Sequence, residues 1–139
     1  MPFQNYGLDW DWSKGFWGKI GRTKAVDFND QIGIYLLQKG SKVVYVGKSG
    51  TGPQSGIGGR LVGHQYDDKK GLWNRVSWFG MRPVRSTGSL VATPTIRMDT
   101  GDAIRDIETV LIYVLGPKLN RASGHYKHMT EYTQCPPPV

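Results

Sequence analysis

Two short runs of apolar residues, separated by a turn, constrain the fold of this chain more than any other feature. Residues 32–37 read Ile-Gly-Ile-Tyr-Leu-Leu, and residues 42–47 read Lys-Val-Val-Tyr-Val-Gly. Both runs are rich in β-branched and aromatic side chains, and residues 39–41 (Lys-Gly-Ser) between them are a turn signal. The pattern predicts a β-hairpin that places Tyr35 and Tyr45 on neighbouring strands.

The length and charge of the chain limit the classes of protein to which it can belong. Its 139 residues are enough for one hydrophobic core, so we expect a single folding unit. The 18 Lys and Arg residues outnumber the 11 Asp and Glu residues, which gives a net charge of +7. This excess favours a polyanionic partner, nucleic acid first, although a basic domain without such a partner has the same charge.

Cysteine content and hydropathy indicate the compartment in which the chain works. Cys135 is the one cysteine of the sequence, which excludes an internal disulfide and any zinc site built from several cysteines. It lies in a short proline-rich tail, where we expect a free thiol. No apolar run is long enough to span a membrane, and residues 1–20 lack the continuous apolar stretch of a signal peptide. We expect a cytoplasmic protein, or one secreted by a route that needs no signal peptide.

The N-terminal residues 1–30 are rich in tryptophan and read as irregular structure. Trp10, Trp12, Phe16 and Trp17 lie among glycines and charged residues. Such side chains either cap a hydrophobic core or stack on bases, and capping is the more frequent role of a tryptophan. We therefore expect an N-terminal extension that packs on the core.

Two further elements follow the hairpin. After a glycine-rich loop at residues 48–56, Arg60 and His64 are four residues apart and lie on one face if the segment is helical. The neighbouring glycines weaken that helix. Residues 73–84 predict a third strand that lies at a sheet edge or ends at Pro83.

The strongest helical pattern covers residues 102–115, and a Gly-Pro pair follows it as a stop signal. The apolar residues at helical spacing are Ile104, Ile107, Leu111 and Leu115. Glu108 lies beside this stripe, where a carboxylate is costly unless it is paired or bound to a cation. Glu108 is therefore a candidate metal ligand, or else an ordinary residue of the helix surface.

The order of these elements resembles the GIY-YIG nuclease superfamily, from about Gln31 to Asn120. The first motif is Gly-Ile-Tyr at residues 33–35, and the second is Tyr-Val-Gly at residues 45–47. The resemblance implies an α/β (α+β) fold with a three-stranded antiparallel sheet flanked by helices. The implied divisions are an N-terminal extension at 1–30, the nuclease domain at 31–125 and a C-terminal tail at 126–139.

The resemblance also implies an active site. The tyrosines of the two motifs, Tyr35 and Tyr45, line it, and the arginine on the first helix after the hairpin corresponds to Arg60. The restriction-enzyme members carry a His or Tyr four residues beyond that arginine, which is His64 here. The metal-binding glutamate of a later helix corresponds to Glu108. We expect His64 and Tyr45 to act together, and which of the three ring side chains is the general base stays open.

Two further positions belong to the implied site. Lys48, just after the second motif, is expected to neutralise phosphate. Asn120, in a Pro-Lys-Leu-Asn context, is expected to anchor the metal helix or to bind near the scissile phosphate. Because the loop before Arg60 is longer than in compact members of the superfamily, Arg75 is the alternative to Arg60.

The implied activity is hydrolysis of DNA phosphodiester bonds with one Mg²⁺ or Mn²⁺ ion. Restriction, mobility of a genetic element, repair or recombination, and an antibacterial toxin are all compatible roles, and a toxin would have an inhibitor or immunity protein as a partner. The alternatives are a binding module of the same fold that does not cleave, and an interaction protein that recruits partners through its aromatic N-terminus and proline-rich tail.

Overall fold

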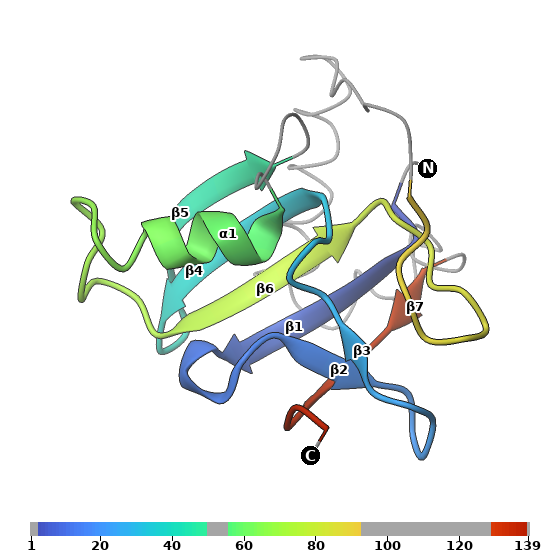
Figure 1. Ribbon diagram of the computed structural model, residues 1–139. Coiled ribbons are helices and arrows are strands. Elements are labelled where there is room, and N and C mark those ends of the chain that lie inside the picture. The colour runs from blue at the N-terminus through green and yellow to red at the C-terminus, as the bar shows by residue number, and fades with distance from the viewer. Residues whose placement is uncertain (1–2, 50–55, 93–128, 139) are drawn as a thin grey trace, which may run out of the picture.

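The computed structural model describes residues 3–49, 56–92 and 129–138, which fold as mixed α+β structure made mostly of strands. A five-stranded sheet has the order β5-β4-β6-β1-β7, and a smaller sheet has the order β3-β2-β8 (Figure 1). The larger sheet consists of β1 (Asn5–Asp11), β4 (Gly33–Lys39), β5 (Lys42–Ser49), β6 (Arg75–Gly80) and β7 (Thr130–Glu131). The other elements are the 3₁₀-helix η1 (Trp12–Lys14), β2 (Trp17–Lys19), β3 (Val26–Asp27), helix α1 (Ile57–Gly63) and β8 (Thr133–Cys135).

The predicted hairpin is confirmed. Strands β4 and β5 pair antiparallel, from Gly33 opposite Ser49 to Lys39 opposite Lys42. The predicted third strand is β6, which pairs antiparallel with the other side of β4. It ends at Gly80, before the proline, but it lies between β4 and β1 and is not an edge strand.

The sheet is wider than the three strands that the sequence predicts. β1 adds to β6 in antiparallel orientation, and β7 adds to β1 in parallel orientation. The irregular structure expected for residues 1–30 is therefore wrong, and β7 and β8 lie in the segment expected to be a tail. β1 escapes sequence analysis because its register shifts between Gly7 and Trp10 and Asp9 has φ 57°, which breaks the alternation that predicts a strand.

Buried side chains gather on both faces of the large sheet, and β4 contributes to both. Tyr35 and Leu37 belong to one cluster, and Ile34 and Leu36 belong to the other. The first cluster also contains Trp10, Phe16, Val26, Phe28, Ile57, Leu61, Trp73, Val76, Trp78 and Tyr132. The second also contains Phe3, Tyr6, Phe79, Met81 and Met129. The core role expected for the N-terminal tryptophans is confirmed for Trp10, which is 2% exposed and packs edge-on to Trp78 at a centroid distance of 5.2 Å.

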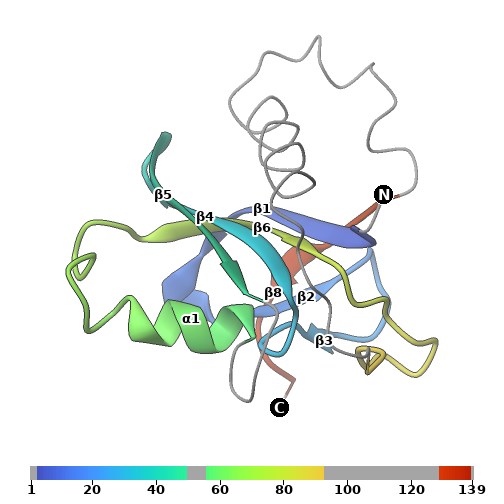
Figure 2. The ribbon, with the colours of Figure 1, turned by 90° about the horizontal axis from the view of Figure 1, so that it is seen from above.

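Helix α1 runs along one face of the large sheet and contacts β4 and β5 (Figure 2). It buries Ile57 and Leu61 in the first cluster. The helix expected at residues 102–115 lies outside the described residues. Of the helices expected to flank the sheet, the described residues therefore include α1. Among the described residues, no helix is long and apolar enough to cross a membrane.

Gln31, which is fully buried, joins the start of β4 to β1 and to the end of β6. Its side-chain oxygen accepts hydrogen bonds from the backbone N–H groups of Ile32 at 3.0 Å and Arg82 at 2.8 Å. Its side-chain nitrogen donates to Oδ1 of Asn5 at 2.7 Å and to the Arg82 carbonyl at 3.0 Å. Every donor and acceptor of the amide is therefore satisfied, which a buried amide requires.

Replacing Gln31 with leucine should lower the free energy of unfolding by roughly 2–4 kcal/mol, because it leaves buried polar groups of three segments without partners. Urea denaturation measures the change. The matched control is Gln4→Leu at an exposed position, which should change stability by less than about 0.5 kcal/mol. Equal effects of the two substitutions would contradict a structural role for the Gln31 amide.

Candidate active site

The two tyrosines of the hairpin lie in or against the cluster that α1 covers. Tyr35 is 1% exposed, Tyr45 is half-buried, and their ring centroids are 6.3 Å apart. Tyr35 pairs with Gly47 across the hairpin, and a Cβ at Gly47 would lie 2.4 Å from the Tyr35 hydroxyl oxygen. The glycine of the second motif therefore makes room for the tyrosine of the first.

Helix α1 confirms that Arg60 and His64 lie one helical turn apart. The backbone N–H of His64, the residue that ends the helix, donates to the Arg60 carbonyl at 3.0 Å. The glycine at position 58, which weakens the helix intrinsically, is needed for packing. A Cβ there would lie 2.3 Å from the side-chain oxygen of Asn29.

A chain of hydrogen bonds joins Tyr35, His64 and Asp67. The Tyr35 hydroxyl lies 2.9 Å from Nε2 of His64, and Nδ1 of His64 lies 2.7 Å from Oδ2 of Asp67. Burial, together with the nearby Tyr45, raises the pKa of Tyr35 to about 12. The backbone N–H of Lys69 and the hydrogen bond from His64 hold the pKa of the Asp67 carboxyl below its usual range. Both ring nitrogens of the histidine are thus occupied.

Tyr45 contacts the same histidine through its ring, with the centroids 5.2 Å apart in an edge-on arrangement. The Lys69 ammonium lies 4.4 Å from the centroid of the Tyr45 ring and 3.0 Å from Oδ1 of Asp68. The hydrogen bond to Asp68 raises the pKa of Lys69, so this side chain stays cationic. The Tyr45 hydroxyl has no hydrogen-bond partner among the described residues.

Arg60 is an exposed cation on helix α1 whose charge acts on Tyr35. Its exposed side chain forms no hydrogen bond or ion pair within the described part of the chain, and its charge acts to lower the pKa of Tyr35, against the effect of burial. By contrast, the guanidinium of Arg75, the alternative position, donates to the Asp9 carbonyl at 3.2 Å. Of the two arginines, Arg60 is the one without a partner among the described residues, and its role in the site stays a prediction.

Lys48 is not brought together with the tyrosines. It is exposed on β5 and pairs with Ile34, whose side chain belongs to the cluster on the other face of the sheet. Because successive side chains of a strand point to opposite faces, Lys48 and Tyr45 point to opposite sides. Lys69, on the loop after α1, is instead a lysine that contacts the Tyr45 ring.

The remaining expected residues, Glu108 and Asn120, lie outside the described residues. Within the ranges that the structure describes, no three His, Cys, Asp or Glu side chains are grouped so that they could hold a metal ion. The expected site requires one protein carboxylate, with water and phosphate completing the octahedral shell that Mg²⁺ prefers. Glu108 is the residue expected to supply it.

Sequence reasoning missed Asp67 and Lys69, which complete the described part of the site. A signal for Asp67 was present, since it follows His64 by three residues and the chain stays in a compact turn there. The Asp67 side chain also accepts a hydrogen bond at 2.8 Å from the backbone N–H of Lys69. One carboxylate therefore orients the histidine and closes the turn that carries the lysine.

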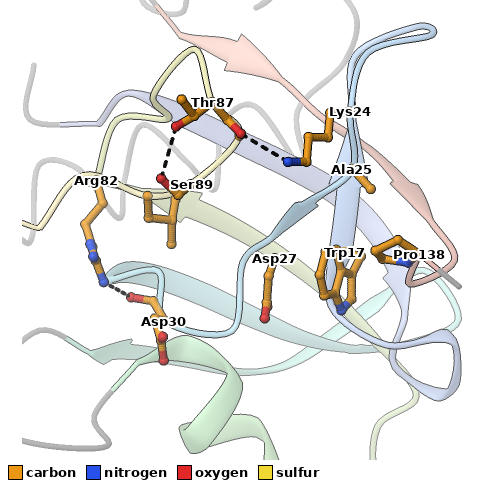
Figure 3. Close-up of a pocket in the computed structure, with 11 residues that line it drawn as sticks. Trp17, Lys24, Ala25, Asp27, Asp30, Arg82, Thr87, Ser89 and Pro138 are labelled. Carbon is orange, nitrogen blue, oxygen red and sulfur yellow. Dashed lines mark hydrogen bonds between the residues drawn. The ribbon is translucent and has the colours of Figure 1, made fainter.

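A separate concavity of about 470 Å³ lies between the β2–β3 arm and the segment after β6 (Figure 3). Two cationic side chains that line it are hydrogen-bonded to backbone carbonyls. Arg82 donates to the Asp30 carbonyl at 2.8 Å, and Lys24 donates to the Thr87 carbonyl at 3.4 Å. Trp17 lines one side of it. The tyrosines and the histidine of the candidate site do not line this concavity, so it is distinct from that site.

Comparison of the chain with protein-family models, with curated proteins and with solved structures finds no match.

Replacing Gly47 with alanine should lower the free energy of unfolding by about 1–3 kcal/mol, because the new methyl group would push the Tyr35 ring out of its packed position. Urea denaturation measures this change. Gly63→Ala is the matched control, because a Cβ at that position meets no heavy atom of the described residues within 4 Å, apart from its chain neighbours and the backbone of its own helix. It should leave stability unchanged or raise it by up to about 1 kcal/mol. Wild-type stability of Gly47→Ala would contradict the tight contact.

Proposed function

We propose that this protein is a metal-dependent endonuclease that hydrolyses phosphodiester bonds of DNA, with a GIY-YIG-like arrangement of its hairpin and first helix. The observation that carries the proposal is the convergence of Tyr35, Tyr45 and His64, from two strands and a helix end, next to Arg60, which has no partner among the described residues. Such a group of proton carriers beside a free guanidinium suits a reaction at a phosphate.

Arg60 is the residue we assign to the phosphate. Its planar guanidinium donates two parallel hydrogen bonds to neighbouring phosphate oxygens and keeps its charge at every physiological pH. These donors stabilise the negative charge that builds up on the equatorial oxygens in the transition state. An arginine already bonded to the protein backbone, like Arg75, is less available for this role.

We assign proton transfer to the ring side chains of Tyr35, Tyr45 and His64. Tyr45, whose hydroxyl is free among the described residues, is placed to bind and orient the attacking water. His64 contacts Tyr45 only through its ring and is hydrogen-bonded to Tyr35, so a proton reaches His64 through the Tyr35 hydroxyl. This assignment modifies the expectation that His64 and Tyr45 act as a pair.

A Mg²⁺ or Mn²⁺ ion, held by Glu108, would supply charge on the phosphate and a more acidic water. The net charge of +7 favours a nucleic acid substrate, because a basic protein binds the backbone phosphates of DNA without regard to sequence. We propose restriction, genetic mobility or an antibacterial toxin as the biological setting, with an immunity protein as a partner in the last case. A binding module that has lost cleavage is the competing proposal, and the first experiment separates the two.

The purified protein should nick or linearise plasmid DNA in Mg²⁺ or Mn²⁺, and a chelator should stop the reaction. Glu108→Ala should abolish cleavage but keep DNA binding, because the basic surface is unchanged. Agarose gels and a binding titration measure the two properties separately. Binding without cleavage by the wild-type protein in either metal would favour the binding module, and metal-dependent cleavage by Glu108→Ala would remove Glu108 from the site.

Arg60→Lys should slow cleavage by roughly two orders of magnitude, because lysine keeps the charge but loses the planar pair of donors. DNA affinity should change much less. Arg75→Lys is the matched control and should cleave at nearly the wild-type rate under single-turnover conditions. The reverse result, a silent Arg60→Lys and a damaged Arg75→Lys, would assign the phosphate to the other arginine.

A further inference from the structure

We propose that Asp67 is a positioning residue that fixes the tautomer of His64, so that Nε2 of His64 accepts the proton of the Tyr35 hydroxyl; these three residues are called the relay below. This inference rests on the proposed function, because the relay has a task only if water is deprotonated at this site. It adds Asp67, a residue that the resemblance does not include.

The hydrogen-bond donors and acceptors of the relay follow from the charge states of its two ends. The lowered pKa of Asp67 keeps its carboxylate ionised at neutral pH, so Oδ2 accepts and Nδ1 of His64 donates. The pKa of Tyr35, about 12, keeps its hydroxyl protonated, so it donates to Nε2. Both ends therefore select the same neutral tautomer of His64, with the hydrogen on Nδ1.

Exposure rises along the relay. Tyr35 is 1% exposed, the His64 side chain 11% and the Asp67 side chain 38%. The relay thus begins in the core beside Gly47 and ends at a carboxylate in contact with water.

Within the described ranges, the charged and titratable groups in contact with His64 come from three segments. Tyr35 approaches from β4, Tyr45 from β5 and Asp67 from the loop after α1. Lys69 lies 3.9 Å from Oδ2 of Asp67 and so shares that carboxylate with the histidine. The Asp67 carboxylate therefore faces Nδ1 of His64, where its negative charge stabilises the imidazolium form of the ring.

This arrangement allows hydrolysis in a step that accounts for every proton and every bond. The water oxygen attacks phosphorus and forms the new P–O bond, while its proton passes to the Tyr35 oxygen and the Tyr35 proton passes to Nε2 of His64. The bond from phosphorus to the leaving oxygen breaks with its electron pair, and solvent water protonates that oxygen. After the product leaves, the imidazolium, stabilised by Asp67, returns its Nε2 proton through the Tyr35 hydroxyl to water, which leaves the hydrogen on Nδ1 again. A histidine with its hydrogen on Nε2 would donate toward Tyr35 and could not accept this proton.

The tautomer can be measured without substrate. In the ¹⁵N NMR spectrum of the wild-type protein, neutral His64 should carry its hydrogen on Nδ1, and Asp67→Asn should lose this preference. Asp68→Asn is the matched control: it makes the same charge change one residue along, and among the described residues Asp68 pairs only with Lys69. This control should keep the wild-type tautomer. An Nε2–H tautomer in the wild-type protein would overturn the relay, whatever the stability of the variants.

Cleavage kinetics then test the chemical role. Asp67→Asn should lower kcat by roughly a hundredfold, within the usual range for proton-transfer catalysis, and should move the acid limb of the pH–rate profile to lower pH. Asp68→Asn should change kcat by less than about twofold and leave the profile in place. Wild-type kcat and profile in a folded Asp67→Asn protein would overturn the relay alone. Absence of cleavage by the wild-type protein would overturn the proposed function, and the relay with it.

Discussion

The burial of β4 on both of its faces is the constraint on which the rest of the structure depends. The strand lies between β5 and β6, and its residues from Ile34 to Leu37 are at most 1% exposed. Because side chains alternate along a strand, a shift of one residue would exchange the two faces. Tyr35 would then leave the α1 side and lose His64. The position of the phenol is therefore fixed by the same register that fills the two hydrophobic clusters.

The candidate site is accordingly built into the core and not added to the surface. Tyr35 is a member of the cluster that contains Trp78 and Leu61, and it also makes the hydrogen bond to His64. Packing holds the phenol, and the turn closed by Asp67 holds the histidine. Arg60 is exposed, and Tyr45 and Lys69 are half-buried, so these three side chains lie at the outer part of the site. Under the proposed function, the buried residues would fix the proton geometry and the exposed Arg60 would adapt to the phosphate.

The sequence predicts those parts of this arrangement whose determinants are local. The hairpin is specified by two β-rich runs and the turn between them, and the spacing of Arg60 and His64 needs only one helical turn. Asp67 could not be assigned in the same way, because its role depends on a turn that brings it to Nδ1. β1 was missed because its irregular register is stabilised by pairing with β6, for example between Asp11 and Arg75, which are 64 residues apart in the chain. Lys48 was misplaced because the resemblance gives its position in the chain and not the face on which its side chain lies.

The pairing of β1 with β7 has a consequence for how the chain is made. Asn5 lies opposite Thr130, so β1 pairs with a strand that is synthesised 125 residues after it. At a synthesis rate of about 5–20 residues per second, the sheet edge beside β1 waits roughly 6–25 s for its partner. The smaller sheet is in the same position, because β2 pairs with β8. During this interval the nascent chain carries β1 and β2 without these partners, and both sheets become complete only after β7 and β8 are synthesised.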